Sequence, residues 1–298
     1  MIDLHMHSSF SDGTKTPTEL VKEARNLGLS AIALTDHDTS DGVTEFMRAG
    51  TEFGITTVPG VEISIDTKLP NNGHLHMLGL FIDPDSSDLK NKLGYLRDHR
   101  NERAGKIINA LNNLGIPITM EELLEEAGEG SIGRPHVAKI LVRSGIVSSI
   151  QEAFDIYLAK GKPAYMDKIK FAETEAIELI HRANGLAILA HPHFMGFDQI
   201  GDTLDKILHL KKLGLDGFEA FYPGMPIDLK NSLLELAREC NLIISGGSDY
   251  HGVNKPGIMM GNGRNDLMVP DAVLADMQNR VTRTFDISNE EIIKTNQI

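Results

Sequence analysis

Short apolar runs alternate with amphipathic helical patterns along much of this chain. The runs at 2–4, 31–34, 56–64 and 74–82 have the composition of buried strands. Helical patterns separate the first three of these runs. Such an alternation predicts βαβ units and a parallel sheet.

The first helical pattern carries signals for both of its ends. Thr16 is a typical N-cap residue, Pro17 occupies the first helical position, and Glu19 completes a capping box. Gly28 provides a C-terminal stop, and the second predicted helix ends in the same way at Gly54. Two helices are therefore predicted between the first three strands.

The alternation stops between residues 84 and 163. Successive helical stretches lie there, with glycine stops and no strand-like run between them. We predict a small all-α insertion domain at 84–163, called the helical insert below, inside a barrel whose two parts are 1–83 and 164–298. The alternation then resumes with the last three of seven strand candidates, at 186–192, 217–221 and 242–251.

Charge and composition exclude several classes of protein. The formal net charge is −13, which argues against a broad basic surface that follows a nucleic-acid backbone. An anionic substrate remains compatible, because bound metal ions reverse the local field. A lone cysteine, Cys240, cannot form an internal disulfide, and no apolar run approaches the roughly 20 residues that span a bilayer. We expect no signal peptide and a cytoplasmic location.

Histidines and carboxylates gather on or just after the predicted strands. In a parallel barrel these strand ends face the same side, where barrel active sites are built. Imidazole nitrogen and carboxylate oxygen are ligands suited to Zn, Mn or Fe. The clusters are His5, His7 and Asp12; Asp36 and His37; Glu62; His74 and His76; His191 and His193; and Asp249 and His251.

Each cluster also has a structural explanation when it is taken alone. An H-x-H pair on one strand face is weak evidence, and Asp38 or Thr39 could simply cap a helix. His76 alone is typical of a half-buried strand residue. The joint pattern, repeated at several strand ends, favours a shared metal site.

The same segments resemble the polymerase-and-histidinol-phosphatase (PHP) phosphoesterases over nearly the whole chain. DLHMHSSFSDG, LTDHDT, ILAHPH and SGGSDYH resemble the family's four motifs, and GVEIS supplies its bridging glutamate. SIGRPHVAKILVRSG and AFDIYLAKGKPAY resemble the helical insert of the branch that hydrolyses nucleotide phosphates. The resemblance implies a distorted (β/α)7 barrel with this insert.

The resemblance also implies three divalent metal ions (Mn, Fe or Zn). His74 and His76 are alternatives for one position, and we favour His76 because it matches the family motif. Asp36 is expected to orient a ligand histidine. The implied ligands are His5, His7, Glu62 and Asp249 for the first ion; His76 and His191, with Glu62 bridging, for the second; and Asp12, His37 and His251 for the third.

Such a site suits phosphate chemistry. Three divalent ions outweigh the three carboxylates among the ligands, so the site attracts an anion. The metals are expected to polarise the phosphoryl oxygens and to lower the pKa of a bridging water towards about 7. A bridging hydroxide then attacks phosphorus, and no protein nucleophile is required.

Substrate-holding residues must lie outside the metal ligands. Arg134 is the first candidate, because a guanidinium group binds phosphate in a bidentate way; a surface arginine at a helix start is the alternative. His136 follows it on the same helix. Lys160 and Lys162 are candidates for a second phosphate or for a helix C-terminus. His193 is a candidate for contacting the substrate or for protonating the leaving oxygen.

Tyr222 and Tyr250 are candidate stacking partners for a base, with core packing as their alternative role. The helical insert would then partly cover the barrel mouth, because Arg134 reaches the metals only from there.

We therefore predict a metal-dependent phosphatase of small phosphomonoesters. The resemblance favours nucleotide 3′-phosphates, as in 3′,5′-bisphosphonucleotides, or short oligonucleotides. Its partner is a small phosphorylated substrate such as a nucleotide, and we expect no long nucleic acid, membrane or obligate protein partner. Histidinol phosphate is the alternative substrate.

Two alternatives belong to other classes. An amidohydrolase also opens with H-x-H on a barrel strand, although that leaves TDHD and the histidine of SDYH unexplained. A non-catalytic PHP scaffold would be expected to have lost some ligands, and all nine positions are filled here.

Overall fold

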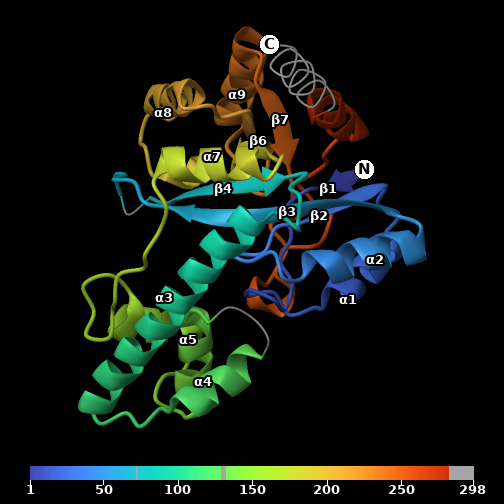
Figure 1. Cartoon of the computed structure of the whole chain (residues 1–298). Helices are drawn as coiled ribbons and strands as arrows, with labels where there is room; N and C mark the ends of the chain where they lie inside the picture. The colour runs from blue at the N-terminus through green and yellow to red at the C-terminus, as the bar shows by residue number, and fades with distance from the viewer. Residues whose placement is uncertain (72, 129–131, 282–298) are drawn as a thin grey trace, which may run out of the picture.

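A seven-stranded curved sheet forms the centre of the computed structural model, which describes residues 1–71, 73–128 and 132–281 (Figure 1). The strands pair in chain order from β1 to β7. Their bounds are β1 Ile2–Asp3, β2 Ala31–Leu34, β3 Thr56–Ile65, β4 Leu75–Leu80, β5 Leu186–Leu189, β6 Gly217–Phe221 and β7 Ile243–Gly246.

The strand β4 corrects the prediction of a wholly parallel sheet. It runs antiparallel to both β3 and β5, whereas the other neighbouring strands are parallel. The physical reason is the short connection between β3 and β4: its described residues, 66–71 and 73–74, include no helix, and so few residues leave no room for a crossover, which makes β3 and β4 a hairpin. The start of β4, rather than its end, thus lies at the barrel mouth.

The two edges of the sheet meet beyond the short first strand. The amide of Leu4 donates to the carbonyl of Gly246 at 3.1 Å, and the amide of Asp249 donates to the carbonyl of His5 at 2.8 Å. Further along, the amide of His7 donates to the carbonyl of Tyr250 at 2.9 Å. These bonds close the sheet and confirm the predicted distorted (β/α)7 barrel.

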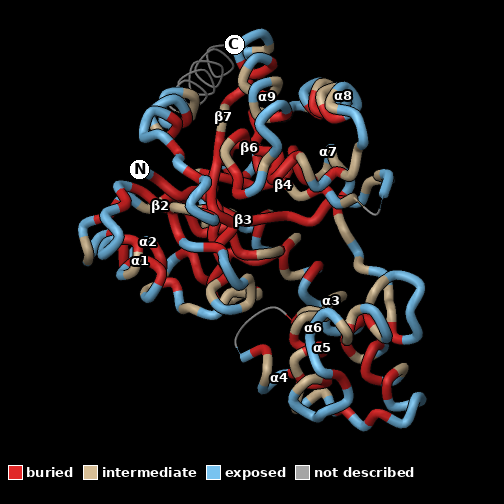
Figure 2. The backbone as a smooth tube through the Cα atoms, turned by 180° about the vertical axis from the view of Figure 1, so that it is seen from behind, coloured by how far each residue is buried: buried red, intermediate tan, exposed pale blue. Residues whose placement is uncertain are grey.

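Helices pack around this sheet, and the sequence signals of the first two are confirmed. Thr16 and Glu19 form the capping box, and Gly54 takes a left-handed conformation at the end of α2. Figure 2 shows the strands almost wholly buried and exposed residues on the helices. The helices are α1 Pro17–Asn26, α2 Val43–Phe53, α7 Glu173–Arg182, α8 Ile200–Lys212 and α9 Ile227–Cys240.

A second group of helices has its own apolar core. Leu89, Leu93 and Leu96, in the first half of α3, pack into the barrel core, whereas Ile107 and Leu111, in its second half, pack among the insert helices. The predicted domain boundaries at 84 and 163 stay predictions. These helices are α3 Ser87–Asn113, α4 Met120–Ala127, α5 Arg134–Arg143, α6 Ile150–Ala153 and the π-helix η1 Phe154–Leu158.

Two short helical segments and one further helix complete the described chain. They are η2 Pro192–Met195, η3 Gly252–Asn254 and a helix at 271–281. Among residues 1–71, 73–128 and 132–281, no helix is long and apolar enough to cross a membrane.

Candidate metal centre

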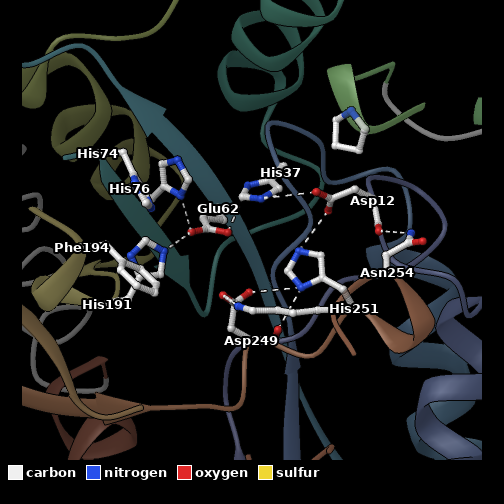
Figure 3. Close-up of a pocket in the computed structure, with 12 residues that line it drawn as sticks. Asp12, His37, Glu62, His74, His76, His191, Phe194, Asp249, His251 and Asn254 are labelled. Carbon is white, nitrogen blue, oxygen red and sulfur yellow. Dashed lines mark hydrogen bonds and ion pairs between the residues drawn. The ribbon is translucent and has the colours of Figure 1, made fainter. Parts of the chain in front are cut away.

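Histidines and carboxylates from separate strands and loops line one cavity at the barrel mouth (Figure 3). Pro135, at the start of α5, also lines this cavity. The helical insert therefore reaches the barrel mouth, where Arg134 was expected to act. The lining residues are Asp12, His37, Glu62, His74, His76, Pro135, His191, Phe194, Asp249, His251, Asn254 and Lys255.

Glu62 lies at the centre of this cluster. It sits within β3 rather than at its end, and its side chain is 1% exposed. Its Oε1 lies 2.8 Å from His76 Nδ1 and 3.0 Å from His191 Nε2. Its Oε2 lies within 3.2 Å of a ring nitrogen in each of three further residues, His5, His7 and His37.

Asp249 and Asp12 extend the cluster to His251. Asp249 Oδ1 lies 3.1 Å from His7 Nε2 and 3.5 Å from His5 Nε2. Asp12 Oδ1 lies 3.2 Å from His251 Nε2, and Asp12 Oδ2 lies 3.9 Å from His37 Nε2.

Four overlapping groups have ligand atoms within 4.8 Å of one another. Together they contain all nine predicted metal ligands, and one of them adds His74 to His76 and His191. The sequence left His74 and His76 as alternatives, and the structure places both in this group. The groups are His5, His7, Glu62 and Asp249; His7, Asp12, His37 and His251; His74, His76 and His191; and His37, Glu62 and His76.

The donor set fits divalent metal ions. In the described part of the chain, the buried Nδ1 atoms of His7 and His191 have no hydrogen-bond partner. A buried polar atom without a partner is costly, and metal coordination removes that cost. Imidazole and carboxylate donors at this spacing suit Zn, Mn or Fe.

The electrostatics of the cavity also favour cations. Burial disfavours the charged form of His7, yet the nearby carboxylates of Asp249 and Glu62 raise its pKa to about 10. Burial lowers the pKa of His37 to about 3, although Glu62 and Asp12 oppose this. Despite burial, His37 and His5 hold the pKa of Glu62 well below its usual range. The carboxylates are therefore ionised and supply a field that stabilises positive charge.

Asp36 orients a loop instead of the histidine that was predicted for it. Its Oδ1 accepts from the Ser8 amide at 2.7 Å and from Ser11 Oγ at 2.5 Å, and its Oδ2 accepts from Ser8 Oγ at 2.6 Å. This loop carries His7 and Asp12, so Asp36 positions these two candidate ligands through the backbone.

Glu219 takes the histidine-orienting role, and the sequence analysis missed it. Glu219 is fully buried, and its Oε1 lies 3.0 Å from His5 Nδ1. Its Oε2 accepts from the His191 amide at 2.7 Å. A carboxylate on the second ring nitrogen fixes the tautomer and orientation of a ligand histidine. The available signal was a single carboxylate in the otherwise apolar strand GFEAF.

Close backbone approaches and unusual backbone angles hold these loops in place. A Cβ on Gly247 would lie 2.4 Å from the amide nitrogen of His5, so only glycine allows β7 to pass this close. Asp38, His191 and Asp249 have φ angles of +54°, +29° and +54°. Such conformations cost of order 1–3 kcal/mol each and cluster at functional sites.

A basic cleft adjoins the cavity and shares Asp12, His37, His76 and Pro135 with it. Arg134, the first candidate for holding phosphate, lies in this cleft, where its Nη1 donates to the Leu158 carbonyl at 3.0 Å. The sequence analysis missed the other three cations. The cations that line the basic cleft are Arg100, Arg103, Arg134 and Lys168.

The cations of the basic cleft are crowded. Burial and the neighbouring charges of Arg134 and Arg100 lower the pKa of Arg103 to about 10. An anion that enters the cleft relieves this repulsion, because it places a counter-charge between the guanidinium groups.

Several predicted substrate residues lie elsewhere. Lys160 and Lys162 are exposed and line neither cavity. His136 is buried, and its Nδ1 accepts from the Gly133 amide at 3.1 Å, so it caps α5 instead. His193 lines neither space, and burial lowers its pKa to about 4, aided by His191.

The aromatic residue at the cavity is a phenylalanine rather than a tyrosine. Tyr222 and Tyr250 are 6% and 8% exposed, which leaves little ring surface for a base. Phe194 is 37% exposed and lines the cavity. Its ring lies 5.3 Å from that of His74 in a stacked arrangement.

Comparison with known sequences supports the same family. Residues 3–132 match the PHP domain. A 5′-3′ exoribonuclease of Haemophilus influenzae is 38% identical over 251 residues, which cover 84% of this chain and 89% of the relative. A 3′,5′-nucleoside bisphosphate phosphatase of Chromobacterium violaceum is 32% identical over 288 residues, which cover 96% and 99% of the two chains.

Solved structures show the same similarity. A candidate metal-dependent phosphoesterase from Bifidobacterium adolescentis aligns with a TM-score of 0.80 and 30% identity, over 94% of this chain and 96% of the other. A Chromobacterium violaceum protein described as an amidohydrolase, with sulfate and no metal bound, aligns with a TM-score of 0.75 and 31% identity, over 92% and 96%. This chain therefore belongs to the PHP family of metal-dependent phosphoesterases.

Proposed function

We propose that this protein hydrolyses nucleotide 3′-phosphates, as in 3′,5′-bisphosphonucleotides, or short oligonucleotides. One observation carries the proposal: the cavity of the nine candidate ligands adjoins the basic cleft through shared lining residues. A substrate with two phosphate groups fits two adjacent sites that both favour anions. The relative named as a nucleoside bisphosphate phosphatase supports the same substrate class.

Three divalent ions, Mn, Fe or Zn, are proposed for the cavity. His5, His7, Glu62 and Asp249 would hold the first, and His76 and His191 the second, with Glu62 shared and His74 available as a further donor. Asp12, His37 and His251 would hold the third. When bound, such ions polarise a phosphoryl oxygen and make an attacking hydroxide available at neutral pH.

The protein's own residues supply placement. Glu219 and Asp36 fix the histidines and the first loop, so the ligand atoms converge before a substrate arrives. Arg134 and its neighbours in the basic cleft would hold the phosphate that is not cleaved, at one end of the substrate. The formal net charge of −13 suits a mononucleotide or short oligonucleotide better than a long strand.

The test compares substrates on metal-stripped protein reloaded with Mn²⁺. Inorganic phosphate release is measured from a 3′,5′-bisphosphonucleotide, a short oligoribonucleotide and histidinol phosphate. His5→Ala is the inactive variant, and His99→Ala is its matched control, because His99 pairs with Glu102 on α3 outside the site. We expect nucleotide-dependent release in the wild type and in His99→Ala only.

Two outcomes would replace the proposal. Release mainly from histidinol phosphate would keep the metal site and change the substrate. Hydrolysis of amides or lactones, with no phosphate ester cleaved, would favour the amidohydrolase reading, which is also the description given to one structural relative.

A further inference from the structure

Lys255 lines the cavity at the barrel mouth, called the metal cavity below, but it is not one of the nine candidate metal ligands. Of the twelve residues that line this cavity, it is the one lysine or arginine. It follows η3, and its side chain is 31% exposed. The cations of the basic cleft lie in the adjoining space. Lys255 is therefore the lysine that shares this cavity with the candidate ligands.

Lys255 contacts one particular oxygen of Asp249. Its Nζ lies 2.5 Å from Asp249 Oδ2 and 2.9 Å from the hydroxyl of Tyr222. Asp249 Oδ1 faces the other way, towards His5, His7 and His251. The two oxygens of this carboxylate thus have separate roles: one faces the metal position, and the other faces Tyr222 and Lys255.

Tyr222 makes the lysine dispensable for holding Asp249. The hydroxyl of Tyr222 lies 2.6 Å from Asp249 Oδ2. An ammonium group only donates, so the hydroxyl accepts from Lys255 and directs its own proton to the carboxylate. Tyr222 is 6% exposed and fixed in the core, whereas the lysine lies on a long side chain at the cavity wall. When Lys255 turns towards a ligand, Asp249 keeps its bond to Tyr222.

The ammonium group also has donor capacity to spare. It carries three N–H groups, and within the described residues two polar partners are found, Asp249 and Tyr222. A lysine ammonium is a compact point charge that binds phosphate oxygens in many sites.

We propose that Lys255 binds an oxygen of the phosphate group that is cleaved, while Tyr222 is the positioning residue that holds Asp249. The proposal rests on the proposed function, because it assumes a phosphate ester in the metal cavity. Lys255 lies in the metal cavity, whereas the cations of the basic cleft would bind the other end of the substrate. In this role Lys255 supplies charge and a hydrogen bond and transfers no proton.

The test uses Mn²⁺-loaded full-length protein with Lys255→Met and Lys255→Arg. Three quantities are measured: kcat/KM, competitive inhibition by inorganic phosphate, and metal bound per chain. Loss of one charge-assisted hydrogen bond is expected to lower kcat/KM of Lys255→Met about 10- to 100-fold and to weaken phosphate inhibition about tenfold. Metal content is expected to stay at the wild-type level, and Lys255→Arg is expected to recover part of both losses.

Two further variants separate this role from a structural one. Lys206→Met is the matched control, because Lys206 also lies 2.5 Å from a carboxylate, Glu173, but outside the cavity. It is expected to leave all three quantities unchanged. Tyr222→Phe is expected to reduce metal affinity, whereas Lys255→Met is expected to leave metal affinity unchanged. A Lys255→Met protein with wild-type phosphate inhibition, or with metal loss parallel to its loss of activity, would overturn the proposal.

Direct binding of inorganic phosphate, measured by calorimetry, distinguishes this proposal from the proposed function. A wild type that cleaves no ester but binds phosphate through Lys255 would support the lysine assignment and contradict the substrate class. A wild type that cleaves nucleotides, with an unaffected Lys255→Met variant, would contradict the lysine assignment alone.

Discussion

Asp38 and Lys168 form an ion pair of 2.6 Å that fastens the chain returning from the helical insert to the loop beside His37. Arg100, on the outgoing helix α3, binds the same carboxylate oxygen. The amide of Ser64 donates to the other oxygen at 2.9 Å. Both connections between barrel and insert therefore meet at one buried carboxylate. Arg100 and Lys168 both line the basic cleft, so this carboxylate joins two of its cations to the loop beside His37.

The first prediction concerns stability. Asp38→Ala removes the partner of two cations that are 10% and 23% exposed, so it is expected to destabilise the fold by about 3–5 kcal/mol. Asp85→Ala is the control, because Asp85 pairs with Lys90 at 2.8 Å in an exposed position. That change is expected to cost less than about 1 kcal/mol. Urea denaturation measures both, and equal effects would contradict a special role for Asp38.

The second prediction concerns pH. Burial and the nearby Arg100 lower the pKa of Lys168 to about 8, although Asp38 opposes them. Lys168 loses its charge as the pH rises through this value, so the basic cleft becomes less positive. The KM for a 3′,5′-bisphosphonucleotide is expected to rise between pH 7 and pH 9. A substrate without a second phosphate is expected to show a smaller change.

Lys168→Arg provides the control for that profile. Arginine stays protonated in this pH range, so the rise in KM is expected to disappear in the variant. A rise of the same size in both proteins would assign the effect to another group.

The ends of the first two helices could be predicted from the sequence. The capping box of Thr16 and the stop at Gly54 are signals carried by neighbouring residues, and both are confirmed. The direction of β4 was missed, because a strand's apolar composition carries no information on its direction. The available signal was the connection 66–74, which lacks a helical pattern.

The sequence predicted those residues of the site that lie on or just after strands. The ligand clusters stand out because polar side chains there interrupt apolar runs. Glu219 and Lys168 contact their partners across 214 and 130 residues, so no local pattern links them. The basic cleft depends on how α3 and the returning chain pack, which only the tertiary structure defines.

The third prediction concerns Glu62, whose carboxylate contacts five histidines. Glu62→Gln removes the negative charge that draws cations into the cavity, so bound metal per chain and phosphate release are both expected to fall to background. Glu102→Gln is the matched control, because Glu102 pairs with His99 at 3.1 Å on the surface of α3. Elemental analysis of the purified proteins is the measurement. Full metal content in Glu62→Gln would contradict the proposed ligand set.

The fourth prediction concerns Glu219. In Glu219→Gln the amide no longer provides a charged acceptor for His5 Nδ1, and metal affinity is expected to fall about 10- to 100-fold. Competition with a chelator measures this affinity. Excess Mn²⁺ is expected to restore activity, since Glu219 orients the ligand and contacts no substrate. Activity that stays absent at saturating metal would instead indicate a direct role in the reaction.

The last prediction concerns Phe194, the exposed aromatic ring in the cavity. Base stacking on such a ring contributes about 1–3 kcal/mol, so Phe194→Ala is expected to raise the KM for a nucleotide about tenfold. Phe194→Tyr keeps the ring and is expected to keep the KM. Tyr95→Ala is the control, because Tyr95 is 50% exposed and lies on α3 outside the cavity. A small phosphomonoester without a base is expected to show no change. An equal rise in KM for that ester would show that Phe194 shapes the cavity and does not stack on a base.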